Sequence, residues 1–548
     1  MIIPTINIST LILLQWILLS MIIYSLISLL KWLHFKWNRF DCFHKQSIPY
    51  PQSSFWFGNL QEYQQNPYET LNKWCQQYGQ CFGFFHCDCP ILVINDRDAV
   101  QELLVKQGSK FPNRQKSNIE LEPFKSSLLH LKDKSWRHSR RVLTPPFTAH
   151  KIAMDSTRQA INLSVKRLLH SMEKKLSKIN NNDNDNDNQL NITQHMNSIT
   201  LDVICRLAFN MNDTDVHDDY SEFRQMVVDF MQKTENPNLR IIEYFPIFSR
   251  LFKILYYMFG NGKLLRTITD NLHEEIAKYY QEKIRNHFDE QNRNNHNDDD
   301  DERKKRKVNM LDFMIEQQEL GNIDEQQLIG NAVVILLAGY ETTATGLSFT
   351  LYLLAKYPEW QEKLREQIMT NFDNDKNDDY CQFDQNRQEL LDRIWYESLR
   401  LYPPVISFIT RRLETGVDEC FIESLNLTIT KEMTIMVPTW SLHHNEKYWP
   451  RPNHFDPYRQ DLPIPGVVTS VKNTAFQAFG SGPRNCIGGN LAISESRAVI
   501  TALLRHYRFD LIDENNPETD SNTGLLKLCC PTVIIHPLKN IRLRVTKI

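Results

Sequence analysis

The chemically most distinctive residue of the chain is a cysteine that stands among glycines. Cys486 lies in "FGSGPRNCIGGN", residues 479–490, which hold four of the 17 glycines of the chain. A helical pattern follows, so the cysteine precedes a helix amino terminus, where unpaired N–H groups and the positive dipole end favour an anion. The sequence therefore predicts a thiolate at Cys486, which could serve as a nucleophile or as a metal ligand.

The surrounding residues favour the metal ligand. A nucleophilic cysteine needs a histidine in a recognisable partner motif, and the 17 histidines are scattered without one. The pattern F-x-x-G-x-R-x-C-x-G, in contrast, is complete, and it resembles the haem-thiolate loop of the cytochrome P450 family. Its five fixed positions are Phe479, Gly482, Arg484, Cys486 and Gly488. A structural cysteine in a turn would leave the other four residues unexplained.

This resemblance implies that the protein binds haem b. Cys486 is then the axial ligand of the iron, and its electron donation favours O–O cleavage. Phe479, Arg484 and Gly488 belong to the implied haem-binding set. Arg484 is implied to meet a propionate, and amides near Gly488 are implied to hydrogen-bond the sulfur. The small residues are implied to clear space for the porphyrin.

A second motif lies in a long apolar helical pattern. The segment "LAGYETTATGLSF", residues 337–349, places Gly339, Glu341, Thr342 and Thr343 where helix propensity disfavours them. It resembles the A/G-G-x-D/E-T-T/S motif of the same family, in which a local break of the helix makes room for dioxygen. The resemblance implies that Thr342 holds the activated oxygen and that Glu341 supplies protons through water. The alternative for each threonine is a hydroxyl that bonds back to the preceding turn.

Three further residues are expected to form a structural network. Glu397 and Arg400 in "YESLRLYPP" are spaced i and i+3, hence on one helical face. Together with Arg459 in "HFDPYR" they resemble the buried glutamate and two arginines that the family places near the proximal side of the haem. Tyr458 stands where a glutamate is more usual, which leaves the arginine in place.

Further propionate contacts are implied by two other segments. Trp136 and Arg140 in "SWRHSRRVLTPPF" share one helical face and resemble a propionate-binding pair of the family, although a plain surface helix has the same spacing. The family has another propionate-binding arginine about ten residues after the position of Arg400. Arg411 and Arg412 both fall near it, and Arg411 is preferred.

The amino terminus predicts a membrane anchor. Residues 1–30 carry no charged side chain, and roughly 20 apolar residues suffice to cross a bilayer, so residues 8–30 are expected to form an uncleaved transmembrane helix. A cleaved signal peptide would have a basic start and a small-residue cleavage site, which are missing. Basic residues follow and place this flank in the cytoplasm: Lys31, Lys36, Arg39 and Lys45, against a single Asp41.

Long 3.6-residue periods and short alternating runs predict a mainly α fold with small β-sheets, the cytochrome P450 fold. Residues 1–45 are expected to be the anchor and its basic flank, and residues 46–548 a cytosolic haem-binding catalytic domain. Disordered surface loops are expected near 180–189, 292–307 and 374–379, because these Asn/Asp-rich stretches cannot bury apolar area. Residues 241–259 could be a core helix or a second, monotopic membrane contact.

The composition of the chain limits the kinds of partner that we expect. A net charge of −3 gives no global basic field, so nucleic acid is not an expected partner. The 11 cysteines, in a reducing compartment, are expected to be free thiols. No G-x-G-x-x-G follows a strand, so electrons are expected from NADPH through a separate flavoprotein reductase. The basic residues of 132–141 could be the docking site for this reductase. Alternatively, they form only a solvated face of the protein.

The resemblance implies a monooxygenase of the endoplasmic reticulum membrane. It would hydroxylate or epoxidise a lipophilic substrate, namely a lipid, a steroid or a xenobiotic, bound by residues 112–131, Val405, Ile406, Phe408 and residues 528–533. Wording such as "AGYETT" is similar to the animal microsomal branch that contains the drug-metabolising liver subfamily and thromboxane synthase. The alternative is a haem-thiolate isomerase or dehydratase that acts on a fatty-acid hydroperoxide or endoperoxide without dioxygen or reductase. A non-enzymatic membrane haem carrier is a third.

Overall fold

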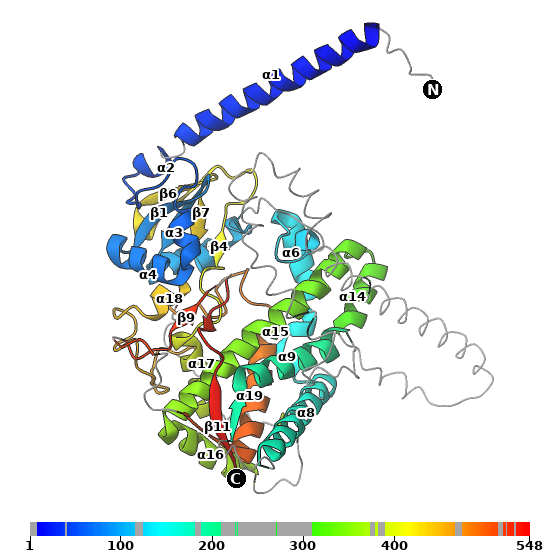
Figure 1. Cartoon of the computed structure of the whole chain (residues 1–548), viewed down its shortest axis with the longest axis vertical. Coiled ribbons are helices and arrows are strands. Elements are labelled where there is room, and N and C mark those ends of the chain that lie inside the picture. The colour runs from blue at the N-terminus through cyan, green and yellow to red at the C-terminus, as the bar shows by residue number, and fades with distance from the viewer. Residues whose placement is uncertain are drawn as a thin grey trace, which may run out of the picture.

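The structure is a computed structural model in which the chain forms helices packed beside small sheets (Figure 1). It describes residues 8–38, 41–115, 124–180, 188–209, 310–372, 379–381, 389–465, 474–512, 519–521, 523–530 and 533–548, with residues 225, 227 and 270. The predicted mainly α fold with small β-sheets is confirmed. The segment 241–259 lies outside the described residues, as do residues 292–307.

The helices lie along the whole described chain. They are α1 (Ile8–Asn38), α2 (Asp41–His44), α3 (Leu60–Gln65), α4 (Pro67–Tyr78), α5 (Arg97–Gln101), α6 (Asp133–Leu143), α7 (Ala149–Ile152), α8 (Asp155–Asn180), α9 (Ile192–Phe209), α14 (Met310–Glu319), α15 (Glu325–Lys356), α16 (Pro358–Phe372), α17 (Glu389–Leu401), α18 (Thr439–His443) and α19 (Gly489–His506).

The strands are short and gather in four sheets. They are β1 (Cys81–His86), β2 (Cys89–Ile94), β3 (Gln189–Asn191), β4 (Thr410–Arg411), β5 (Glu419–Ile422), β6 (Leu427–Thr430), β7 (Thr434–Met436), β8 (Tyr507–Asp510), β9 (Leu528–Cys529), β10 (His536–Pro537) and β11 (Arg542–Lys547). The largest sheet has the order β1-β2-β7-β4, with β2 and β7 parallel. This sheet therefore contains both β2, near position 90, and β4, the strand that ends with Arg411.

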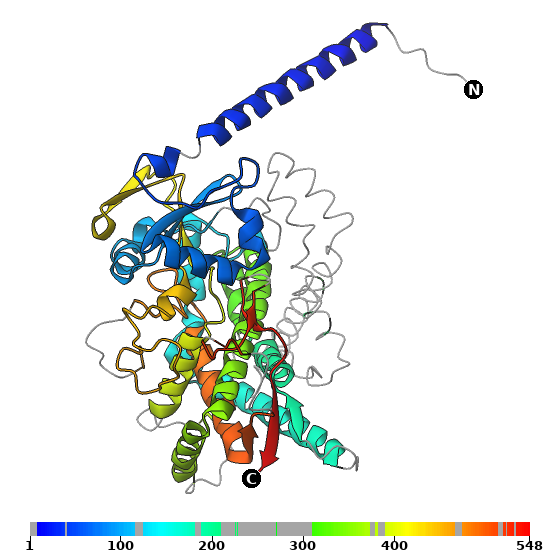
Figure 2. The same ribbon diagram turned by 60° about the vertical axis from the view of Figure 1, so that its left-hand side comes forward.

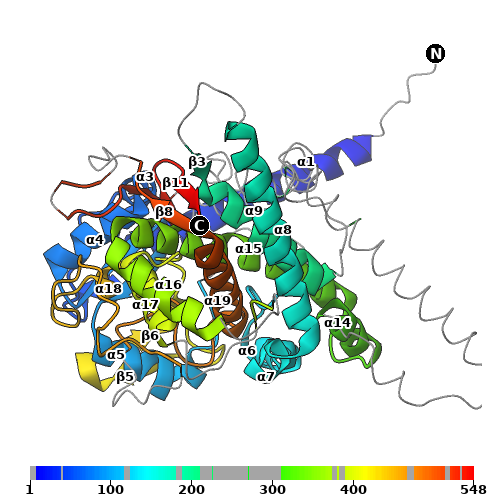
Figure 3. The ribbon, with the colours of Figure 1, turned by 90° about the horizontal axis from the view of Figure 1, so that it is seen from below.

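Helix α15 is the central element of the helical part. A capping box fixes its start: Asp324 accepts from the Gln327 amide at 2.7 Å, and the Gln327 side chain accepts from the Asp324 amide. It packs against α9, α17 and α19 (Figure 3). A Cβ at Gly339 would lie 3.0 Å from Ile204 of α9, and a Cβ at Gly346 would lie 2.8 Å from Trp395 of α17. Glycine at these positions lets neighbouring helices approach closely.

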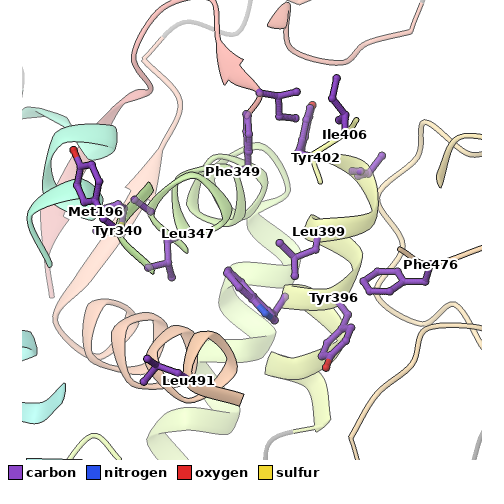
Figure 4. Close-up of a cluster of buried hydrophobic side chains, with 14 of the residues drawn as sticks. Met196, Tyr340, Leu347, Phe349, Tyr396, Leu399, Tyr402, Ile406, Phe476 and Leu491 are labelled. Atoms are coloured by element: carbon purple, nitrogen blue, oxygen red, sulfur yellow. The ribbon is translucent and has the colours of Figure 1, made fainter. Parts of the chain in front are cut away.

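Apolar side chains fill the space around α15. Phe349 of α15 stacks on Tyr402 with ring centroids 4.6 Å apart, and Leu347, Leu399 and Leu491 bring α15, α17 and α19 into one cluster (Figure 4). Burial of each such side chain contributes about 1.5–3 kcal/mol. This packing fixes α15 beside α19, the helix that follows Cys486.

Helix α1 projects from one end of the molecule, next to α2 and the largest sheet (Figure 2). Two described helices are long and apolar enough to cross a membrane: Gln15–His44, with an exposed apolar window, and Glu325–Lys356, which is 67% buried. Since α15 is the core helix, only the amino-terminal span is a candidate anchor.

Two residues at the edges of the low-complexity stretches have partners in the structure. Gln189 starts β3, which pairs with β11, and Asp379 forms an ion pair with Arg158 at 2.6 Å. A strand partner and an ion pair hold these residues, whereas 181–187 and 373–378 lie outside the described part of the chain.

The predicted network of Glu397, Arg400 and Arg459 is assembled and buried. Arg400 forms two hydrogen bonds with the Glu397 carboxylate, at 2.7 and 2.8 Å, and Arg459 donates to the same carboxylate at 2.9 Å. Both guanidiniums also donate to backbone carbonyls, including that of His454. Tyr458 is half exposed and packs on Trp360 at 5.1 Å, away from the network.

Glu397→Gln should lower the free energy of unfolding by about 3–5 kcal/mol, because it leaves two buried guanidiniums without a carboxylate. Glu389→Gln on the same helix is the matched control. Glu389 pairs with Arg393 at a half-exposed site and should matter by under about 1 kcal/mol. Urea unfolding followed by circular dichroism measures both, and equal losses would contradict a structural role for the buried network.

Candidate functional site

The loop that carries Cys486 is a tight turn held by backbone contacts. The Cys486 amide donates to the Phe479 carbonyl at 2.8 Å, and Gly480 and Gly482 have φ of +66° and +73°. A Cβ at Gly482 would lie 1.6 Å from the Leu104 carbonyl oxygen. The glycine at 482 is therefore required by a close approach of backbone to backbone, which differs from the expected role of clearing space for a porphyrin.

Cys486 is exposed to solvent, although many protein atoms lie around its sulfur. Burial raises its pKa, and the amides of Gly488 and Gly489, together with the charge of Arg140, oppose that rise. The amides at the start of the helix thus act in the direction that the sequence predicts, toward the thiolate, and burial acts against them. A metal cation at the sulfur would reverse the balance and deprotonate the thiol. The amides of Gly488 and Gly489 hydrogen-bond the sulfur, as the resemblance implies for the amides near Gly488.

Four arginines gather near this loop, and we call Arg114, Arg140, Arg411 and Arg484 the arginine cluster. Burial, then Arg411 and Arg140, lower the pKa of Arg484 to about 9; burial lowers that of Arg411 to about 10. Burial, Arg411 and Arg484 lower the pKa of Arg114. Within the described chain no carboxylate lies within ion-pair distance of these four. The cluster is therefore a buried region of like charge that would attract an anion.

Hydrogen bonds and rings hold the cluster in place. Arg484 lies 4.2 Å from the Trp136 ring and donates to the carbonyls of Leu128 and Leu131 at 3.2 and 2.6 Å. Arg140 donates to the Asn485 side chain at 2.9 Å. The face of α6 that carries Trp136 and Arg140 thus meets the Cys486 loop, so a plain surface helix is excluded.

The choice between Arg411 and Arg412 is resolved by the strand. Side chains alternate across β4, and Arg411 is 3% exposed and donates to the Arg484 carbonyl at 3.4 Å. Arg412 points the other way and donates to the Lys431 carbonyl at 2.8 Å. Arg411 is therefore the cluster member.

Sequence reasoning missed Arg114. It lies in the segment expected to contact substrate, and no local motif marks it. Its guanidinium lies 4.1 Å from the Phe408 ring and donates to the Phe408 carbonyl at 2.8 Å, while its Nε is buried without a partner. Among the described residues this buried donor has no partner, so an anion bound at the cluster could accept a hydrogen bond from it.

One short stretch of α15 is open although its neighbours are buried. Ala338 is exposed, and Gly339, Glu341 and Thr342 are half-buried, whereas Thr343 is buried. Spacings of three and four residues put Ala338, Glu341 and Thr342 on one side of the helix. Glu341 and Thr342 therefore lie on a side of this helix that its described neighbours do not cover completely.

The helix runs unbroken through this stretch, contrary to the expected local break. The Thr342 hydroxyl donates to the Ala338 carbonyl at 2.7 Å, which is the back-bonded alternative named above. Ser348 and Thr350 make the same bond with Ala344 and Gly346. Back-bonding satisfies the hydroxyl and preserves the helical ladder.

Glu341 has a partner that the sequence did not reveal. Its Oε1 lies 3.2 Å from Nε2 of His536, which is on β10, and its Oε2 is buried without a partner. The carboxylate is thus held on one side and free to accept on the other. His536 lies almost 200 positions away in the chain, in a hairpin with β9, so no local pattern could indicate it.

His443 of α18 links the ion network to the cysteine loop. It bonds to the Arg400 carbonyl through Nδ1 at 3.0 Å, and the Gln477 amide donates to its Nε2 at 2.7 Å. Because Nε2 accepts, the hydrogen-bond network assigns the proton to Nδ1. Burial and the charge of Arg400 lower the pKa of His443 to about 3, so it stays neutral. This third unpredicted residue holds the loop at Gln477, two positions before Phe479.

The predicted substrate-contact residues are only partly available. Val405 and Phe408 are half-buried, whereas Ile406 is 1% exposed and packs in the core cluster. Val405 forms a bridge with Ile534. Residues 116–123 and 531–532 lie outside the described residues.

Comparison with known proteins identifies the class. Residues 48–535 match the family described as Cytochrome P450. The chain is 27% identical over 503 residues to Cytochrome P450 3A6 of Oryctolagus cuniculus, covering 90% of this chain and 92% of that protein. It is 28% identical to Cytochrome P450 3A12 of Canis lupus familiaris, covering 85% and 86%. The same comparison gives 27% identity to Cytochrome P450 3A41 of Mus musculus, covering 95% of both.

The chain therefore belongs to the cytochrome P450 family, and its relatives belong to the animal microsomal branch. This membership supports haem-thiolate monooxygenase chemistry in general, with iron held by a cysteine thiolate and electrons from a redox partner.

The residues around Cys486 fit a haem. Its propionates would bring carboxylates to the arginine cluster, where the buried Nε of Arg114 lacks a partner. Its iron would supply the positive charge that keeps Cys486 ionised against burial, while the amides of Gly488 and Gly489 bond the sulfur. Arg114, Arg140, Arg411 and Arg484 are thus the groups that would hold the propionates, with Trp136 beneath Arg484.

Arg114→Gln should accelerate haem loss about tenfold or more, because a charge-assisted hydrogen bond to a carboxylate contributes roughly 1.5–3 kcal/mol. Transfer of haem to apomyoglobin, followed by absorbance, measures the rate. Arg412→Gln is the control, since Arg412 lies next to the cluster but bonds to a surface carbonyl. If both variants lose haem at the wild-type rate, Arg114 is not a propionate ligand.

Proposed function

We propose that the protein is a membrane-anchored monooxygenase that uses dioxygen and electrons from an NADPH-dependent flavoprotein reductase to hydroxylate or epoxidise a lipophilic substrate. The observation that carries the proposal is the cysteine loop flanked by the arginine cluster, and the exposed side of a core helix that carries Glu341 and Thr342 supports it. Haem held by Cys486 supplies oxygen activation when bound.

The side chains of α15 would control protons. While Thr342 donates to the Ala338 carbonyl, its oxygen retains lone pairs and can accept a hydrogen bond from an O–H group. Glu341 keeps one carboxylate oxygen toward His536 and one without a partner, so it can exchange a proton with water. Together they offer an acceptor and a proton source one residue apart.

The organisation proposed for the chain is an endoplasmic reticulum anchor in residues 1–45 and a cytosolic catalytic domain in residues 46–548. The exposed apolar window of the amino-terminal span and the microsomal relatives support it. Arg137, one candidate for reductase docking, already pairs with Glu414 at 2.6 Å, so the exposed Lys134 and Arg141 are the better candidates.

The alternative function is a haem-thiolate isomerase or dehydratase that rearranges a hydroperoxide or endoperoxide. One observation favours it: α15 is continuous at Thr342, without the break expected for dioxygen. Such an enzyme would need neither Glu341 nor a reductase, yet Glu341 is held by a dedicated partner.

Thr342→Ala should lower product formed per NADPH consumed by about tenfold or more, while NADPH oxidation continues. The protein is reconstituted with reductase in lipid, and product and NADPH are measured for a panel of lipids, steroids and xenobiotics. Ser348→Ala is the control, because it removes the same back-bond from a buried position six residues further on. Wild-type coupling in Thr342→Ala, or turnover of a hydroperoxide without NADPH, would favour the alternative.

His536 should act through Glu341. His536→Phe and Glu341→Gln should each lower coupled product formation about tenfold, and the double variant should be no worse than either, since one interaction is removed. His536→Gln keeps a hydrogen-bond donor and should recover most of the coupling. The solvent deuterium isotope effect on product formation should rise with the loss; additive losses or an unchanged isotope effect would contradict the role.

A further inference from the structure

A lysine at the end of the anchor helix is completely buried. Lys36 lies on the last turn of α1 and has 0% exposure, although the sequence shows it only as one of four basic residues of the flank. A buried ammonium is costly unless each of its three donors is satisfied. Its surroundings satisfy all three: the carbonyls of Phe55 and Trp56 at 3.3 and 2.7 Å, and the Asp88 carboxylate at 3.0 Å.

Asp88 ties this lysine to the catalytic domain. It follows β1 in the tight turn before β2, next to Cys87, whose φ is +55°. One carboxylate oxygen faces Lys36, and the other accepts from the Trp32 indole at 2.9 Å. Trp32 and Lys36 are one helical turn apart, so a single carboxylate holds one face of α1.

Aromatic rings close the site around the ammonium. Lys36 Nζ lies 4.7 Å from the centre of the Trp32 ring and 5.7 Å from those of Phe55 and Trp56. Cation–π contacts strengthen when the cation is desolvated, as it is here. Three rings, two carbonyls and one carboxylate from three chain segments therefore form a joint between α1 and the domain.

The outer side of this joint is exposed and aromatic. Trp37 is 76% exposed and Trp56 50% exposed, and Trp37 packs edge-on against Phe55 at 6.4 Å. Tryptophan side chains are enriched at membrane interfaces, where an apolar ring and a polar N–H both find partners. At about 1.5 Å per residue, Trp37 lies roughly 10 Å beyond residue 30, which ends the uncharged run, or less if α1 is tilted.

We propose that the Lys36 joint locks α1 to the catalytic domain, so that Trp37 and Trp56 together form a surface that binds the phospholipid headgroup layer. The inference rests on the proposed membrane anchor. It makes the anchor and the β1–β2 turn one rigid body, rather than a tethered pair, and fixes the orientation of the domain on the bilayer (Figure 2).

The test uses the full chain in nanodiscs of phosphatidylcholine and phosphatidylserine. Spin labels are attached through non-natural amino acids at Leu26 of α1 and at Gln76 of α4, both exposed, and their distance distribution is measured. The wild type should give one narrow distribution. Lys36→Gln and Asp88→Asn should each broaden it severalfold. Lys31→Gln removes an exposed charge from the same flank and should leave it narrow.

A label at Ser54 reports the headgroup contact. Its accessibility to oxygen and to a nickel chelate should place it at headgroup depth in the wild type and in water in Lys36→Gln. A broad wild-type distribution, or Lys36→Gln and Asp88→Asn variants that keep the wild-type width and depth, would overturn the proposal. Carbonate extraction separates the causes, because loss of the wild type from membranes disproves the anchor, whereas retention with an unlocked joint disproves only the lock. Thermal unfolding checks that each variant is folded.

Discussion

The constraint on which the site depends is a group of four arginines, two buried and two half-buried, that have no carboxylate partner among the described residues. Like charges in a low-dielectric interior repel one another, and the pKa of each cluster member is lowered as a result of burial or of its neighbours. Residues 112–115 and 124–131, helix α6, strand β4 and the Cys486 loop all converge there. Among the described residues no carboxylate pairs with these arginines, and the propionates of a haem would supply that negative charge.

Rigid parts of the protein lie on both sides of the Cys486 loop and the arginine cluster. The network of Glu397, Arg400 and Arg459 holds the segment on one side, and a neutral His443 transmits that order to the cysteine loop through the Gln477 amide. On the other side α15 is fixed by packing and by its capping box. The only polar opening along the described middle of this helix carries Glu341 and Thr342. Because both parts are rigid, groups at the reactive centre rearrange little during the reaction, so rearrangement adds little to the activation free energy.

Local spacing predicted part of this arrangement. Cys486, the Glu397–Arg400 pair and the Trp136–Arg140 pair each lie within one turn or loop, so their sequence patterns survive folding. Arg114, His443 and His536 could not be found in this way, because their partners lie far along the chain. Lys36 was interpreted as a flank charge because sequence cannot show that Asp88 and three rings surround it. Thr342 was expected at a helix break, but its own hydroxyl satisfies the backbone of an intact helix.

The central claim is that Cys486 carries the iron of a haem as a thiolate. The most direct measurement is the absorbance spectrum of the carbon monoxide adduct of the reduced, purified protein. The account predicts a thiolate-type spectrum that is lost in Cys486→Ala. A spectrum of the histidine-ligated type, or a thiolate-type spectrum that persists in Cys486→Ala, would contradict it.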